Sequence, residues 1–130
     1  MRNTEQFKDT LFARLHSLLL EGLDLKVIQG KMGGRVNIRF GDKNLTLNYK
    51  GFFREDNNVI YLFPRNAEDD DDFDKTIVHE FLHSVYPIFS ETKIEEETDE
   101  IRRSVPGFLQ VLKSLYNIKT REQYINDRNI

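Results

Sequence analysis

Residues 76–85 read Thr-Ile-Val-His-Glu-Phe-Leu-His-Ser-Val and place a polar trio inside an otherwise apolar segment. Phe73, Ile77 and Phe81 recur every four residues, which is the spacing of one buried helical face. Pro87 follows shortly, and proline cannot continue a helix. We therefore expect a helix from about Phe73 to the residue before Pro87, packed into the core.

The polar trio has the pattern His-Glu-x-x-His and consists of His79, Glu80 and His83. Histidines four residues apart lie on one face of a helix, so both can reach one Zn²⁺ at about 2.0–2.1 Å. Glu80 lies about 100° around the helix axis and is the residue type that takes a proton from the attacking water in metal-dependent hydrolysis. The alternative is a surface helix whose polar residues are merely solvated, but the apolar neighbours favour the metal site. The remaining histidine, His16, is expected on the surface of an earlier helix.

A catalytic zinc site usually has three protein ligands, so a third ligand is required. The chain has no Cys, and acidic residues crowd the next predicted helix. Ile94 and Ile101 mark the buried stripe of that helix, and Glu97 falls between them. We therefore expect Glu97 to face inward, where a carboxylate needs a partner, and we rank it first as the zinc ligand. Glu96 and Glu100 are rotated from the stripe by about 100° and rank second and third.

The first half of the chain predicts one helix followed by a small sheet. Apolar residues at helical spacing run from Phe7 to Leu19, and Gly22 suits the end of that helix. Alternating or wholly apolar segments then predict strands near residues 25–28, 36–40, 45–49, 52–53 and 59–63. The last strand is apolar throughout and is expected in the interior of the sheet. Short connections favour an antiparallel meander, so we expect an α+β fold with a mostly antiparallel sheet of three to four strands.

The last third of the chain predicts further helices. One begins near Lys93 or Glu95, and Pro106 either kinks it or opens a new helix at its first position. The polar residues 117–130 predict a loosely packed tail or a short terminal helix. With 130 residues, the chain is expected to form a single domain.

Residues 76–85 resemble the active-site helix of the zincin metallopeptidases. More narrowly, the chain is similar to the small, minimal gluzincin-type proteins of phages and bacteria, in which a short sheet precedes the His-Glu-x-x-His helix and a second helix supplies a Glu ligand. The likeness spans roughly residues 45–112. It implies that His79 and His83 are metal ligands, that Glu80 is the general base, and that a Glu in 95–100 is the third ligand.

Three features depart from that family pattern. Residues 95–100 offer several carboxylates for one ligand position. Pro106 is unexpected inside a helix that carries a ligand. No His or Tyr is assigned to stabilise the oxyanion of the reaction, for which Tyr49, Tyr61 and Tyr86 are candidates.

The charge of the chain is concentrated in its middle. Residues 66–100 hold two basic and thirteen acidic side chains, whereas the net charge of the whole chain is −3. A nucleic-acid surface shows a basic cluster with interleaved aromatic residues, so no nucleic-acid partner is expected. The acidic run from Glu68 to Asp74 predicts a solvated loop leading into a helix start. The alternative, a site for a hard cation, lacks the required ligand spacing.

The absence of Cys excludes disulfides, thiolate zinc sites and a Cys nucleophile. The N-terminus has no basic-then-apolar signal pattern, and no apolar run approaches the ~20 residues that span a bilayer. We therefore expect a soluble, cytoplasmic protein without a membrane partner.

The leading hypothesis is a zinc-dependent metallopeptidase that cleaves a protein or peptide substrate with Glu80 as general base. The alternatives are a catalytically inactive zinc-binding module and a metal-free interaction or regulatory domain. Glu80 favours the enzyme, because a purely structural zinc site needs no base. The ligand set prefers Zn²⁺, although Co²⁺, Ni²⁺ or Mn²⁺ could occupy the same site in vitro.

Overall fold

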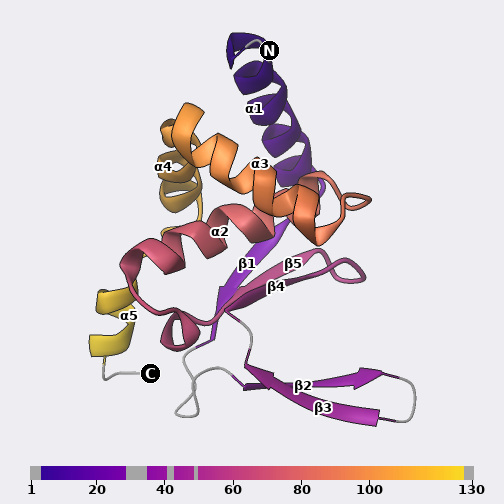
Figure 1. Ribbon diagram of the computed structural model, residues 1–130, viewed down its shortest axis with the longest axis vertical. Coiled ribbons are helices and arrows are strands. Elements are labelled where there is room, and N and C mark those ends of the chain that lie inside the picture. Colours follow the sequence, from indigo (N-terminus) through magenta and orange to yellow (C-terminus); the bar gives the residue numbers. More distant parts are fainter. Residues whose placement is uncertain (1–3, 29–34, 41–42, 49, 128–130) are drawn as a thin grey trace.

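The computed structural model describes residues 4–28, 35–40, 43–48 and 50–127, which form an α+β fold (Figure 1). A helix comes first, strands follow, and four helices complete the described chain. In chain order the elements are α1 (Thr4–Leu20), β1 (Asp24–Val27), β2 (Arg35–Phe40), β3 (Lys43–Asn48), β4 (Gly51–Arg54), β5 (Val59–Leu62), the short 3-10 helix η1 (Pro64–Asn66), α2 (Asp70–Val85), α3 (Glu91–Ser104), α4 (Pro106–Leu115) and α5 (Arg121–Asn126). The predicted fold class and the predicted order of helix, strands and helices are confirmed.

The main sheet has three strands in the order β1-β5-β4. The interior position predicted for β5 is confirmed, and Ile60 and Leu62 of this strand are fully buried. The predicted antiparallel meander is wrong, because β1 pairs with β5 in parallel, with Asp24 opposite Val59. Strands β4 and β5 form an antiparallel hairpin, while β2 and β3 pair with each other in a separate two-stranded sheet.

Helix α2 is the centre of the fold. It packs across the main sheet, and α1, α3 and α4 lie on its other side (Figure 1). Its apolar residues Phe73, Ile77 and Phe81 are fully buried, as their spacing predicts. Asp69 caps the helix by accepting a hydrogen bond from the backbone N–H of Asp72, so the acidic run forms a helix start that the macrodipole favours.

The C-terminal elements enclose α2. Pro106 opens α4 as its first residue, which is one of the two expected outcomes. Of the two expectations for the end of the chain, the short terminal helix is found within the described residues, because α5 begins with a complete capping box and buries Tyr124 edge-on against Phe73. The guanidinium of Arg121 ties α5 to the body by donating to the backbone carbonyls of Pro64 and Ala67.

Among the described residues, no helix combines the length and the apolar character needed to cross a membrane.

Candidate metal centre

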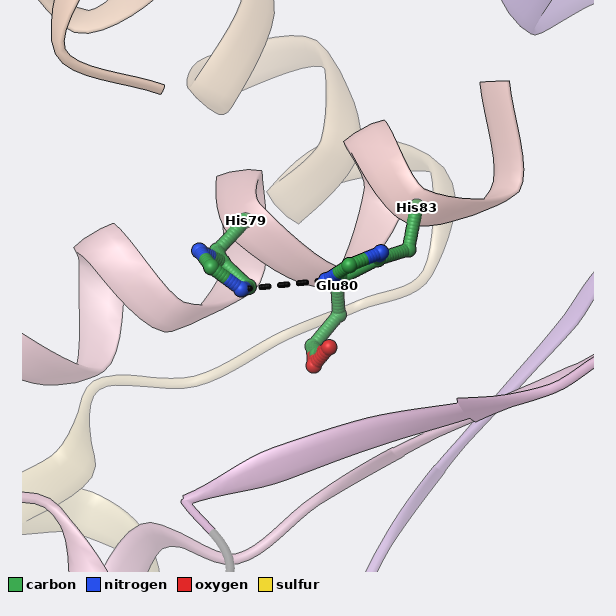
Figure 2. Close-up of side chains that lie close together, drawn as sticks. All are labelled: His79, Glu80 and His83. Carbon is green, nitrogen blue, oxygen red and sulfur yellow. Dashed lines mark hydrogen bonds between the residues drawn. The ribbon is translucent and has the colours of Figure 1, made fainter. Parts of the chain in front are cut away.

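Helix α2 presents His79 and His83 side by side, one turn apart. Their Nε2 atoms are 3.2 Å from each other, and Figure 2 shows the two rings meeting along the helix. Both side chains are half-buried and line an open cleft of about 700 Å³ between α2, β4 and α3. The structure therefore brings together the two histidines that the sequence pattern singles out.

Glu91, the first residue of α3, completes a three-residue cluster with the histidines. Its Oε1 lies 2.7 Å from His83 Nε2, and its Oε2 lies 3.2 Å from His79 Nε2. The connection between α2 and α3 comprises only residues 86–90, so the start of α3 lies beside the end of α2. The Ser90 side chain caps α3 and fixes Glu91 in its first turn.

These three side chains fit a tetrahedral zinc ion. Two ligand atoms at about 2.0–2.1 Å from a tetrahedral Zn²⁺ lie about 3.3 Å from each other. The two histidine Nε2 atoms are 3.2 Å apart, and the Glu91 carboxylate contacts them through its two oxygens, at 3.2 Å from His79 and 2.7 Å from His83. Two imidazoles and one carboxylate are also a donor set typical of catalytic zinc. Little side-chain movement is therefore needed for the cluster to hold the ion.

The surroundings of His79 favour the form of the side chain that binds metal. Burial, followed by the neighbouring His83, lowers the pKa of His79, and the charges of Glu91 and Glu95 oppose this shift only in part. A lowered pKa favours the neutral imidazole, which is the ligand form.

Glu80 points away from the two rings, toward the sheet (Figure 2). A carboxylate oxygen of Glu80 and one ring nitrogen of each histidine nevertheless lie within 4.8 Å of one another. Glu80 is only 5% exposed, and it forms no hydrogen bond or ion pair with any residue that the structure describes. Burial, and secondarily the charge of Glu91, raises the pKa of Glu80 to about 8. An ionisable group that is buried without a partner costs stability and points to a function, and a nearby dication would favour its charged form.

Strand β4 forms the opposite wall of the cleft. A Cβ atom placed on Gly51 would lie 3.0 Å from Glu80 Cγ, so only glycine lets the strand approach Glu80 this closely. Phe63 N–H donates to Lys50 O, and antiparallel alternation then turns the backbone groups of Gly51 and Phe53 outward. Within the described strands, β4 has β5 as its sole neighbour, so these outward groups face an open edge beside the histidines.

The structure does not bring Glu97 to the histidine pair. Glu97 is buried, as its position in the apolar stripe predicts, but it lines a second hollow with Phe7 and Phe89, and its Oε1 lies 3.5 Å from Lys93 Nζ. Glu96 is exposed, and Glu100 pairs with Arg103 and Ser104. Neither of these two residues lines the cleft, whereas Glu95 does.

The two described tyrosine candidates do not line the cleft. Tyr61 stacks on Phe52 and Tyr86 stacks on Phe89, and neither tyrosine lines the cleft. Tyr49 lies outside the described residues. His16 is exposed on α1, as predicted.

Sequence reasoning missed Glu91 because it placed the start of the second helix too late. Ser90 is a good N-cap residue, and with the helix starting at Glu91, both Glu91 and Glu95 fall on one face. The short connection of residues 86–90 was a second signal for Glu91, because it brings the end of α2 and the start of α3 together.

Comparisons of the chain with protein-family models, with curated proteins and with solved structures find no match. The function proposed below therefore rests on the geometry and chemistry of the site.

Proposed function

We propose that the protein is a zinc-dependent metallopeptidase in which His79, His83 and Glu91 hold the metal and Glu80 is the general base. The observation that carries the proposal is the convergence of two histidine nitrogens, 3.2 Å apart, and the Glu91 carboxylate, whose two oxygens each contact one of them, beside a buried carboxylate without a described partner. The proposal includes the expectations from the sequence that the substrate is a protein or peptide, that nucleic acid is not a partner, and that the protein is cytoplasmic.

The residues divide the chemistry of hydrolysis between them. A Zn²⁺ ion held by the two histidines and Glu91 would polarise a carbonyl group and lower the pKa of a water molecule. Glu80 accepts a proton from the water as its oxygen attacks the carbonyl carbon, and then donates that proton to the departing amine nitrogen. The C–N bond breaks, one water molecule is consumed, and Glu80 returns to its starting state.

The open edge of β4 offers a way to hold the substrate. An extended peptide can add to an exposed sheet edge through backbone hydrogen bonds. The outward groups of Gly51 and Phe53 supply such bonds, and Gly51 lies directly over Glu80. A peptide bound there would pass between the strand and the histidine pair, with its backbone within reach of the base.

A zinc-binding module without turnover is the second candidate, and Glu95 favours it. This carboxylate lines the same cleft one turn after Glu91, so it could supply a fourth ligand and close the site, as in structural zinc sites. Glu80 distinguishes the two functions, because only a hydrolase needs the base.

The test compares the wild-type protein with Glu80→Gln, each loaded with zinc. Both are incubated with a peptide library, and the products are identified by mass spectrometry. We expect cleavage by the wild type, a loss of rate of at least about 100-fold in the variant, and equal zinc content in both. Zinc bound by both proteins without cleavage by either would refute the peptidase and leave the zinc-binding module.

A further inference from the structure

The two long walls of the cleft run in the same direction. Lys50, just before β4, lies 3.0 Å from Asp72 in the first turn of α2. Gly51, the next residue, lies against Thr76 and Glu80, which come later in α2. One end of the cleft therefore lies beside the first residues of β4 and α2. The other end lies where β4 ends.

The first end carries a cation that is available to a ligand. Lys75 lines the cleft and lies one turn before His79, on the same face of α2. It is half-buried and forms no ion pair with any residue in the described ranges. Its charge helps to lower the pKa of Asp72, which shows that the two groups are near each other without being paired.

Asp72 is bound more directly by two other groups than by Lys75. Its Oδ2 accepts a hydrogen bond of 2.9 Å from the backbone N–H of Glu68 and lies 3.0 Å from Lys50 Nζ. Burial opposes the ionisation of Asp72, but these two partners and the charge of Lys75 together outweigh it, so the pKa of this carboxyl is lowered. Lys50 also lies 3.9 Å from Glu68 Oε1, so it is shared between two carboxylates, whereas Lys75 has no ion pair among the described residues and can meet a ligand.

The second end of the cleft is anionic. It is lined by Glu55, which follows β4, and by Glu95 of α3. Both side chains are exposed, and each would repel an acidic group on a ligand. An acidic side chain is thus attracted at one end of the cleft and repelled at the other.

We infer that the cleft selects peptides with an acidic side chain at its Lys75 end, an inference that rests on the proposed peptidase function. Four helical residues span about 6 Å along the axis of α2, and an extended peptide rises about 3.3 Å per residue. The selected acidic residue therefore lies about two residues from the bond that faces the histidines. Acidic residues on the opposite side of that bond are disfavoured.

Binding to an inactive protein tests this inference separately from catalysis. Fluorescently labelled decapeptides of Gly, Ala, Ser and Leu carry one Asp, Asn or Lys at each position in turn. Their affinities are measured for zinc-loaded Glu80→Gln protein, with and without Lys75→Glu, and the zinc content of each sample is determined. Lys8→Glu in the same background is the matched control, because Lys8 is exposed on α1 and does not line the cleft.

We expect the Asp peptide to bind at least about threefold more tightly than the Asn peptide at one central position, with the preference weakening as salt rises. Lys75→Glu should reverse this preference, so that the Lys peptide binds more tightly than the Asp peptide. Lys8→Glu should leave the preference for the Asp peptide unchanged. Equal binding of the three peptides at every position, no peptide binding, or a preference that survives Lys75→Glu would overturn the inference. Failure of the protein with intact Glu80 to cleave any peptide, with the Asp preference present, would refute the peptidase while the selection by Lys75 stands.

Discussion

Replacing Gly51 with Ala is expected to strain the wall of the cleft. The new Cβ would lie 2.9 Å from Thr76 Cγ2, 3.0 Å from Glu80 Cγ and 3.1 Å from the carbonyl oxygen of Tyr61. Carbon atoms normally pack about 3.5–4.0 Å apart, so both carbon contacts are too short, and the carbonyl belongs to the central strand. Overpacking of this kind costs about 1–3 kcal/mol. The lower entropy of the unfolded Ala chain returns about 0.4–1 kcal/mol, which leaves a net loss of up to about 2.6 kcal/mol, with a midpoint of about 1.3 kcal/mol.

Urea unfolding followed by circular dichroism, with EDTA present, measures this loss without any contribution from metal. Gly107→Ala is the matched control, because a Cβ at this position of α4 meets no atom within 4 Å. In a helix that change is expected to stabilise by up to about 1 kcal/mol. If Gly51→Ala changes the free energy of unfolding by less than about 0.5 kcal/mol, the normal range for an unconstrained surface site, then β4 does not pack against Glu80 as described.

Three further predictions concern the ligands, the C-terminus and acid stability. Glu91→Gln should weaken zinc binding at least about tenfold, whereas Glu97→Gln should leave the zinc affinity unchanged. Zinc titration against a chromogenic chelator measures both affinities, and equal effects of the two changes would contradict the placement of Glu91. Tyr124→Ala should lower the free energy of unfolding by about 2–4 kcal/mol, and a loss near zero would mean that α5 is not docked. Asp72, whose pKa is lowered from 3.8, stabilises the fold above that value and loses this contribution as the pH falls through its folded pKa. The stability difference between wild type and Asp72→Asn should therefore shrink from pH 7 to pH 3, and an undiminished difference at pH 3 would exclude the pair with Lys50.

The fold was predictable wherever the signal was local. Helical spacing and Gly22 indicated where α1 ends, Pro106 was recognised as a kink or a helix start, and the uniformly apolar β5 was recognisable as an interior strand. The partner of β1 was not predictable, because a strand's periodicity shows which face is buried but not which strand lies beside it or in which direction. Strand β5 needs neighbours on both edges, and β1 fills the edge that the β4–β5 hairpin leaves open.

For the candidate site as well, the features within one helix were predictable from the sequence, and the contacts between helices were not. The pattern from His79 to His83 belongs to a single helix, so its geometry follows from the sequence. The choice of Glu97 used helical phase alone, which correctly predicts that this side chain is buried but does not say against which element. Glu97 lies about 9 Å further along α3 than Glu91, and only the short loop after α2 decides which of these turns meets the histidines.

The zinc content of the purified protein, measured by elemental analysis beside His79→Ala, tests the central claim most directly. The proposed centre predicts about one zinc ion per chain in the wild type and its loss in the variant, together with some loss of stability, because metal binding contributes to folding. No zinc in either protein, even after incubation with excess metal and removal of the unbound ion, would contradict it. The cluster of His79, His83 and Glu91 would then be an ion pair and hydrogen bond without a metal.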